Sequence, residues 1–175
     1  KASKYHPDSQ KIISSMETNG SKVIDMMMGS HDKQVVFFKN MTHHLMNLDR
    51  SFLNNTVNVI LTRNPVEMLP SYAKVINNPS MDDVGYALQV DLLNYLNERD
   101  LNPLVIDSTK VLLNPEKELM YLCKRINIPF NDKMLLWKPQ PIKEDGVWAK
   151  HWYKNIHKSE GFNKYKPKTE PFPMD

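Results

Sequence analysis

The sequence contains few of the residues and patterns that mark several common classes of protein. Its only cysteine is Cys123, so no internal disulfide can form, and we expect a protein of a reducing compartment, the cytoplasm. No apolar run approaches the roughly 20 residues that cross a membrane. Lysine and arginine form no dense block of the kind that binds nucleic acid. We therefore expect neither a membrane nor a nucleic acid as partner.

Metal ligands and glycine-rich loops are scarce as well. No second cluster of histidine or cysteine has metal-ligand spacing, so we expect no metal. The chain has 5 glycines and lacks the Gly-x-x-x-x-Gly-Lys-Ser/Thr loop, which argues against kinase-like phosphoryl transfer. The remaining composition, with 41% hydrophobic residues and a net charge of +3, is typical of a mildly basic globular domain. A site for a small anionic ligand is enough to explain the excess of cations.

Short apolar runs alternate with helical patterns along the middle of the chain. Strands are predicted at residues 34–38, 57–61 and 104–106, and helices at 65–76, 81–99, 114–126 and 132–137. This alternation predicts an α/β fold, a three-layer parallel sheet flanked by helices. We expect one domain with an irregular N-terminal part (1–33), an α/β core (34–137) and a C-terminal arm (138–175).

The most informative stretch joins a strand, a cation and the start of a helix. Asn64 is suited to cap the helix, Pro65 to occupy its first position, and Glu67 to complete a capping pattern. Arg63 thus stands where a strand gives way to a helix N-terminus, which attracts anions. Ser71 follows about two turns later. Arg63 and Ser71 together indicate a grip for a phosphate.

A second group of reactive side chains follows the first predicted strand. Ligands of open parallel sheets bind beyond the carboxyl ends of the strands, and Lys39, His43 and His44 come after residues 34–38. A histidine can take a proton from an alcohol or amine, and a lysine can neutralise charge on a bridging oxygen. Together with Arg63, these groups suit the transfer of an anionic group from a nucleotide to an acceptor.

The motif Arg63-Asn64-Pro65 with Ser71-Tyr72, preceded by Lys39, resembles the nucleotide-dependent sulfotransferases. That family has a P-loop-like α/β fold and uses 3′-phosphoadenosine 5′-phosphosulfate (PAPS) as its donor. The resemblance implies that Arg63 and Ser71 bind the 3′-phosphate and that Lys39 is catalytic. It also implies a histidine general base, either His43 or His44, with His44 slightly favoured.

The C-terminal third extends the resemblance. Asn114-Pro115-Glu116 is similar to the start of a family helix, and Gly146 to Lys150 is similar to the stretch after the family's C-terminal phosphate loop. The Arg-Lys-Gly of that loop is absent, and Lys143 or Lys150 would substitute for it. The run looks closest to a sulfotransferase-like branch found alone in bacteria and fused to aminotransferase-like domains in plants. The implied partners are a small-molecule hydroxyl or amine acceptor and a fused or associated aminotransferase-like domain.

One family feature is missing from the sequence. The loop for the 5′-phosphosulfate, a Gly- or Ser/Thr-rich turn after a strand, should precede the strand at 34–38, but residues 1–33 contain no such pattern. We expect that the sequence begins after this loop, so that the chain is an incomplete enzyme, inactive by itself and missing an inner strand. The alternative is a non-catalytic nucleotide- or anion-binding domain of the same fold.

Overall fold

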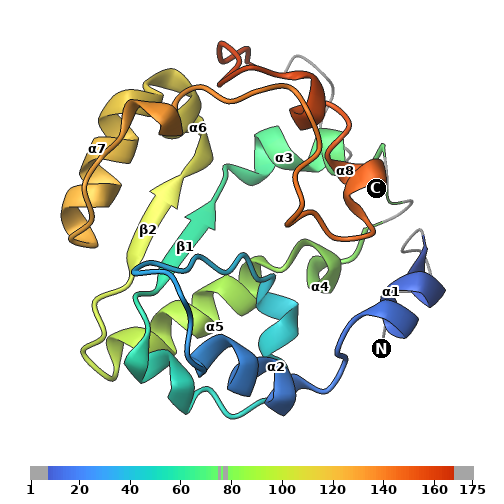
Figure 1. Cartoon of the computed structure of the whole chain (residues 1–175), viewed down its shortest axis with the longest axis vertical. Helices are drawn as coiled ribbons and strands as arrows, with labels where there is room; N and C mark the ends of the chain where they lie inside the picture. The colour runs from blue at the N-terminus through green and yellow to red at the C-terminus, as the bar shows by residue number, and fades with distance from the viewer. Residues whose placement is uncertain (1–7, 75, 77–78, 168–175) are drawn as a thin grey trace. The chain divides into compact units, whose positions relative to one another are not determined.

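The computed structural model describes residues 8–74, 76 and 79–167 (Figure 1). The chain forms two compact units whose segments alternate in the sequence. The first unit comprises Lys1–Ser9, Val59–Pro79 and Leu104–Asp175, and the second comprises Gln10–Asn58 and Ser80–Pro103.

A small parallel sheet forms the centre of the first unit. Strand β1 (Val59–Thr62) pairs with β2 (Leu104–Asp107), with Val59 opposite Leu104 and Thr62 opposite Asp107. Helix α3 (Pro65–Tyr72) follows β1, and helix α6 (Ser108–Leu113) follows β2. Because the strands are parallel, both helices begin at the same edge of the sheet (Figure 1). The α/β prediction is confirmed in this coarse form, with two strands among the described residues.

The start of α3 confirms the predicted roles of Asn64 and Pro65. The Asn64 Oδ1 accepts a hydrogen bond from the Val66 N–H at 3.0 Å, and Pro65 occupies the first turn. The predicted capping role of Glu67 is wrong, because its carboxylate bonds to the Thr109 and Tyr165 hydroxyls instead. The helix ends at Tyr72, earlier than the predicted residue 76, and contains the buried Pro70, whose missing N–H weakens its second turn.

The rest of the first unit consists of helical segments and a C-terminal arm. Asn114 caps α7 by accepting from the Lys117 N–H at 3.1 Å. The buried Cys123 lies on α7, with its Sγ 3.8 Å from the Met134 Sδ. In the arm, the Phe162 ring packs edge-on against Trp137. The segments are α7 (Pro115–Arg125), the 3₁₀ helices η3 (Asp132–Met134) and η4 (Ile156–Lys158), and α8 (Ala149–Trp152).

The second unit is helical. It holds most of α1 (Ser9–Ser15), together with α2 (Gly20–Met28), the 3₁₀ helices η1 (Thr42–Leu45) and η2 (Ser51–Asn55), α4 (Met81–Val84) and α5 (Tyr86–Asn97). Leu53 and Leu96 are buried and form the centre of its core. Among the described residues of the whole chain, no helix is both long and apolar enough to cross a membrane.

Three sequence predictions fail in the second unit. Residues 34–38 are not a strand: no described strand lies in this unit to satisfy their backbone groups, and Phe37 is 82% exposed. The N-terminal part predicted to be irregular contains α1 and α2. The single helix predicted at 81–99 is broken at Gly85, which adopts φ +73 and separates α4 from α5.

Candidate functional site

Arg63 lies at the carboxyl edge of the small sheet, one residue beyond β1 and just before the capped start of α3. Its side chain is 29% exposed, and its Nη2 lies 3.8 Å from the Glu67 Oε2. A cavity of about 630 Å³ opens beside it. The cavity is lined by Arg63, Leu112, Asn163, Lys164, Tyr165 and Lys166. Three cations on one cavity make it suitable for an anionic ligand.

The Glu67 carboxylate, next to Arg63, accepts hydrogen bonds from two other segments of the first unit. Its Oε2 accepts a hydrogen bond from the Thr109 hydroxyl at 3.0 Å, and its Oε1 accepts one from the Tyr165 hydroxyl. This second bond raises the pKa of Tyr165, and burial and the charge of Glu67 raise it further. The carboxylate therefore attaches the C-terminal arm to α3 and lies close to the Arg63 guanidinium.

The other predicted phosphate ligands differ in their relation to this cavity. Ser71 is half-buried on α3, about two turns beyond Arg63. Lys143 is exposed in a loop, and Lys150 on α8 pairs with Asp8. Neither lysine is among the residues that line the Arg63 cavity.

Lys164 and Lys166 line the Arg63 cavity and were missed from the sequence. Both belong to the arm, which the sequence predicts only as an extended segment. No periodic signal in the sequence marks them, because Tyr165 between them lines the same cavity and bonds to the distant Glu67.

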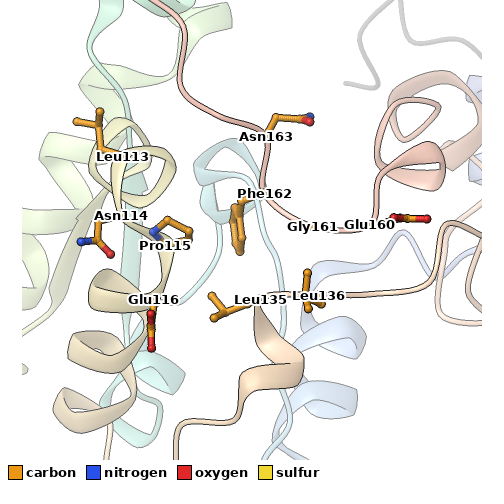
Figure 2. Close-up of a pocket in the computed structure, with 10 residues that line it drawn as sticks. All are labelled: Leu113, Asn114, Pro115, Glu116, Leu135, Leu136, Glu160, Gly161, Phe162 and Asn163. Atoms are coloured by element: carbon orange, nitrogen blue, oxygen red, sulfur yellow. The ribbon is translucent and has the colours of Figure 1, made fainter.

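A second cavity, of about 550 Å³, lies where the arm passes α6 and α7 (Figure 2). Its walls are mostly apolar, and Figure 2 shows the Phe162 ring directed into the space bordered by Pro115 and Leu135. Asn163 lines both cavities. An apolar part of a ligand could thus occupy a space adjoining the cationic one. The lining residues are Leu113, Asn114, Pro115, Glu116, Leu135, Leu136, Glu160, Gly161, Phe162 and Asn163.

The histidines lie in the second unit, on η1, and make different hydrogen bonds. The His43 Nε2 bonds to the Asp82 carbonyl, whereas the His44 Nδ1 bonds to the Met41 backbone N–H at 3.4 Å. Burial lowers the pKa of His44, and the positive charges of His43 and Lys39 lower it further. The effect on the pKa of His44 indicates that Lys39 and His43 lie near it. No group of three or more potential metal ligands occurs within the described part of the chain.

Comparison with known proteins identifies the family of the chain. Residues 1–173 match the family described as "Sulfotransferase domain". Two plant proteins from Arabidopsis thaliana are similar over 96% of the chain: "Branched-chain-amino-acid aminotransferase-like protein 1" at 38% identity and "Branched-chain-amino-acid aminotransferase-like protein 2" at 34%. The chain spans 30% of the length of each. No solved structure gives a significant match. Since the family match covers nearly all of its residues, the chain belongs to the sulfotransferase domain family.

Proposed function

We propose that this protein transfers a sulfo group from PAPS to the hydroxyl or amine of a small-molecule acceptor. The observation that carries the proposal is the Arg63 cavity, where Arg63, Lys164 and Lys166 gather at the carboxyl edge of the sheet in a member of the sulfotransferase domain family. We propose that the whole domain has the P-loop-like fold of that family. No metal is required in this account.

The 3′-phosphate of the nucleotide is the ligand we propose for Arg63. An arginine can bind a phosphate through two parallel hydrogen bonds, and we propose that Ser71, on the following helix, adds a third donor. Lys164 and Lys166 contribute charge to the same cavity. Lys143 and Lys150 remain candidates for the outer part of the phosphate site.

The chemistry is proposed for the cluster of Lys39, His43 and His44. A histidine accepts the proton of the acceptor, the acceptor oxygen or nitrogen bonds to sulfur, and the bond from sulfur to the bridging oxygen of PAPS breaks. Lys39 stabilises the negative charge left on that oxygen. The products are the sulfated acceptor and 3′-phosphoadenosine 5′-phosphate.

A non-catalytic binding domain is the second candidate. The sequence contains no Gly- or Ser/Thr-rich turn for the 5′-phosphosulfate, so we propose that these 175 residues alone transfer little sulfo group. By analogy with the names of the plant relatives, a fused or associated aminotransferase-like domain is a proposed partner. The single buried cysteine favours a cytoplasmic location.

The transfer proposal is tested on the protein expressed from its complete reading frame. PAPS is incubated with a panel of phenols, alcohols and amines, and the release of 3′-phosphoadenosine 5′-phosphate is measured. We expect release that depends on the acceptor and falls by about 10²-fold or more in Lys39→Ala. Binding of the nucleotide without acceptor-dependent release would instead support the non-catalytic domain.

A further inference from the structure

The two neighbouring histidines use different ring nitrogens in their hydrogen bonds, Nε2 in His43 and Nδ1 in His44. A backbone carbonyl can only accept a hydrogen bond, so the His43 Nε2 that meets the Asp82 carbonyl must carry the proton. A backbone N–H can only donate, so the His44 Nδ1 that meets Met41 must be unprotonated. In the neutral rings, His43 therefore has its lone pair on Nδ1, and His44 carries its proton on Nε2.

These assignments give the two rings different abilities. The His43 Nδ1 has no hydrogen-bond partner within the described residues, so its lone pair is available to receive a proton. The His44 lone pair is already used by the Met41 N–H, and its Nε2 can only donate. The lowered pKa of His44 keeps this ring neutral, so it acts as an uncharged donor.

The break between α4 and α5 makes room for the His43 ring. A Cβ atom on Gly85 would lie 2.9 Å from the His43 Cε1, 3.6 Å from its Nδ1 and 3.2 Å from the Thr42 Oγ1. Gly85 is buried, and its φ of +73 is a conformation that side chains rarely adopt. The Asp82 carbonyl is among the last carbonyls of α4, which have no partner farther along that helix. One helix break thus provides both the acceptor and the clearance for His43.

We propose that His43, acting through Nδ1, is the general base, and that Gly85 is its positioning residue. This assignment rests on the proposed sulfo transfer. The acceptor's proton moves to the His43 Nδ1 while the new bond to sulfur forms, and the electron pair of the breaking bond stays on the bridging oxygen of PAPS. His44 donates a hydrogen bond from Nε2 and takes no proton.

The protonation of the two rings can be measured directly. Long-range ¹H–¹⁵N NMR spectra of the ¹⁵N-labelled protein distinguish protonated from unprotonated ring nitrogens at a pH well above about 6.5, the ordinary pKa of histidine. His43→Gln and His44→Gln assign the signals. We expect the His43 proton on Nε2. A His43 ring with its proton on Nδ1 would overturn the proposal, whether or not the protein binds nucleotide.

Two further variants test the positioning role. Gly85→Ala should shift the His43 ring and reduce the population with the proton on Nε2, whereas Met81→Ala, at an exposed position of the preceding helix α4, should not. An unchanged His43 spectrum in a folded Gly85→Ala protein would exclude this role for Gly85. In the transfer assay, His43→Gln should lower kcat by about 10²-fold to 10⁴-fold and His44→Gln by less than about tenfold. An equal loss in both would refute the assignment.

Discussion

At the scale of single residues, Glu67 is the group that competes most directly with an incoming phosphate for Arg63. Its carboxylate lies 3.8 Å from the Arg63 Nη2 and accepts hydrogen bonds from Thr109 and Tyr165. The same side chain therefore orders the edge of the cavity and opposes anion binding. A substitution that removes the charge of Glu67 but keeps its shape distinguishes its effect on anion binding from its effect on stability.

Glu67→Gln should bind 3′-phosphoadenosine 5′-phosphate more tightly, by up to about fivefold, because a partly exposed charge pair is worth up to about 1 kcal/mol. The variant should also lose about 0.5–1.5 kcal/mol of unfolding free energy through its weakened hydrogen bonds. Calorimetry and denaturant unfolding measure the two effects. Glu98→Gln, at an exposed position of the second unit, is the control. Weaker binding in Glu67→Gln would mean that the carboxylate helps to hold the ligand.

His44 gives a second prediction at this scale, through its titration. Its pKa is lowered by burial and by the charges of His43 and Lys39, so NMR titration should find its midpoint below the ordinary value. Lys39→Gln should raise that pKa, whereas Lys22→Gln on α2 should leave it unchanged. Because the pKa of His44 is lower in the folded protein, the unfolded chain takes up the proton first as the pH falls below about 6.5, the ordinary pKa of histidine. The stability contributed by neutral His44 is therefore present above that pH and is lost as the pH falls through the folded pKa. A midpoint above the ordinary value would contradict the described environment.

At the scale of elements, the caps of α3 and α7 are alike in chemistry and differ in location. Asn64 and Asn114 each accept a backbone N–H at the start of a helix, and each is followed by proline. Only Asn64 adjoins Arg63. Helix capping and ligand binding can therefore be separated by comparing the two positions.

Asn64→Ala and Asn114→Ala should each lower the unfolding free energy by about 1 kcal/mol, because each removes one cap. Only Asn64→Ala should also weaken the contact with the 3′-phosphate, since the first turn of α3 then holds Arg63 less firmly. Denaturant unfolding is compared for the pair, and calorimetry compares the affinities for 3′-phosphoadenosine 5′-phosphate and adenosine 5′-phosphate. An equal gain in affinity from the 3′-phosphate in both variants would show that the start of α3 has no part in binding it.

At the scale of the whole molecule, local signals predicted the parts that depend on neighbouring residues. The strand before Arg63 and the Asn64 cap were predicted, because each needs only a few consecutive residues.

The failures arose where distant segments decide the structure. Residues 34–38 have the composition of a strand, but a strand needs a partner, and within the described residues none lies in their unit. Lys164 and Lys166 line the Arg63 cavity on either side of Tyr165, which bonds to Glu67, 98 residues earlier in the chain. The role of Gly85 depended on the position of the His43 ring. Contacts between residues that are far apart in the chain produce no periodic pattern in the sequence, so none of these could be predicted from it.

The central claim is that Arg63 holds the 3′-phosphate of a sulfo-donor nucleotide. Isothermal titration of the protein with 3′-phosphoadenosine 5′-phosphate tests it most directly, with Arg63→Gln compared with Arg125→Gln, an exposed arginine at the end of α7. Adenosine 5′-phosphate, which lacks the 3′-phosphate, is the ligand control. We predict that Arg63→Gln weakens binding at least about tenfold, as expected for a lost charged hydrogen bond, and that Arg125→Gln does not. No binding by the wild-type protein, or equal binding by both variants, would contradict the account.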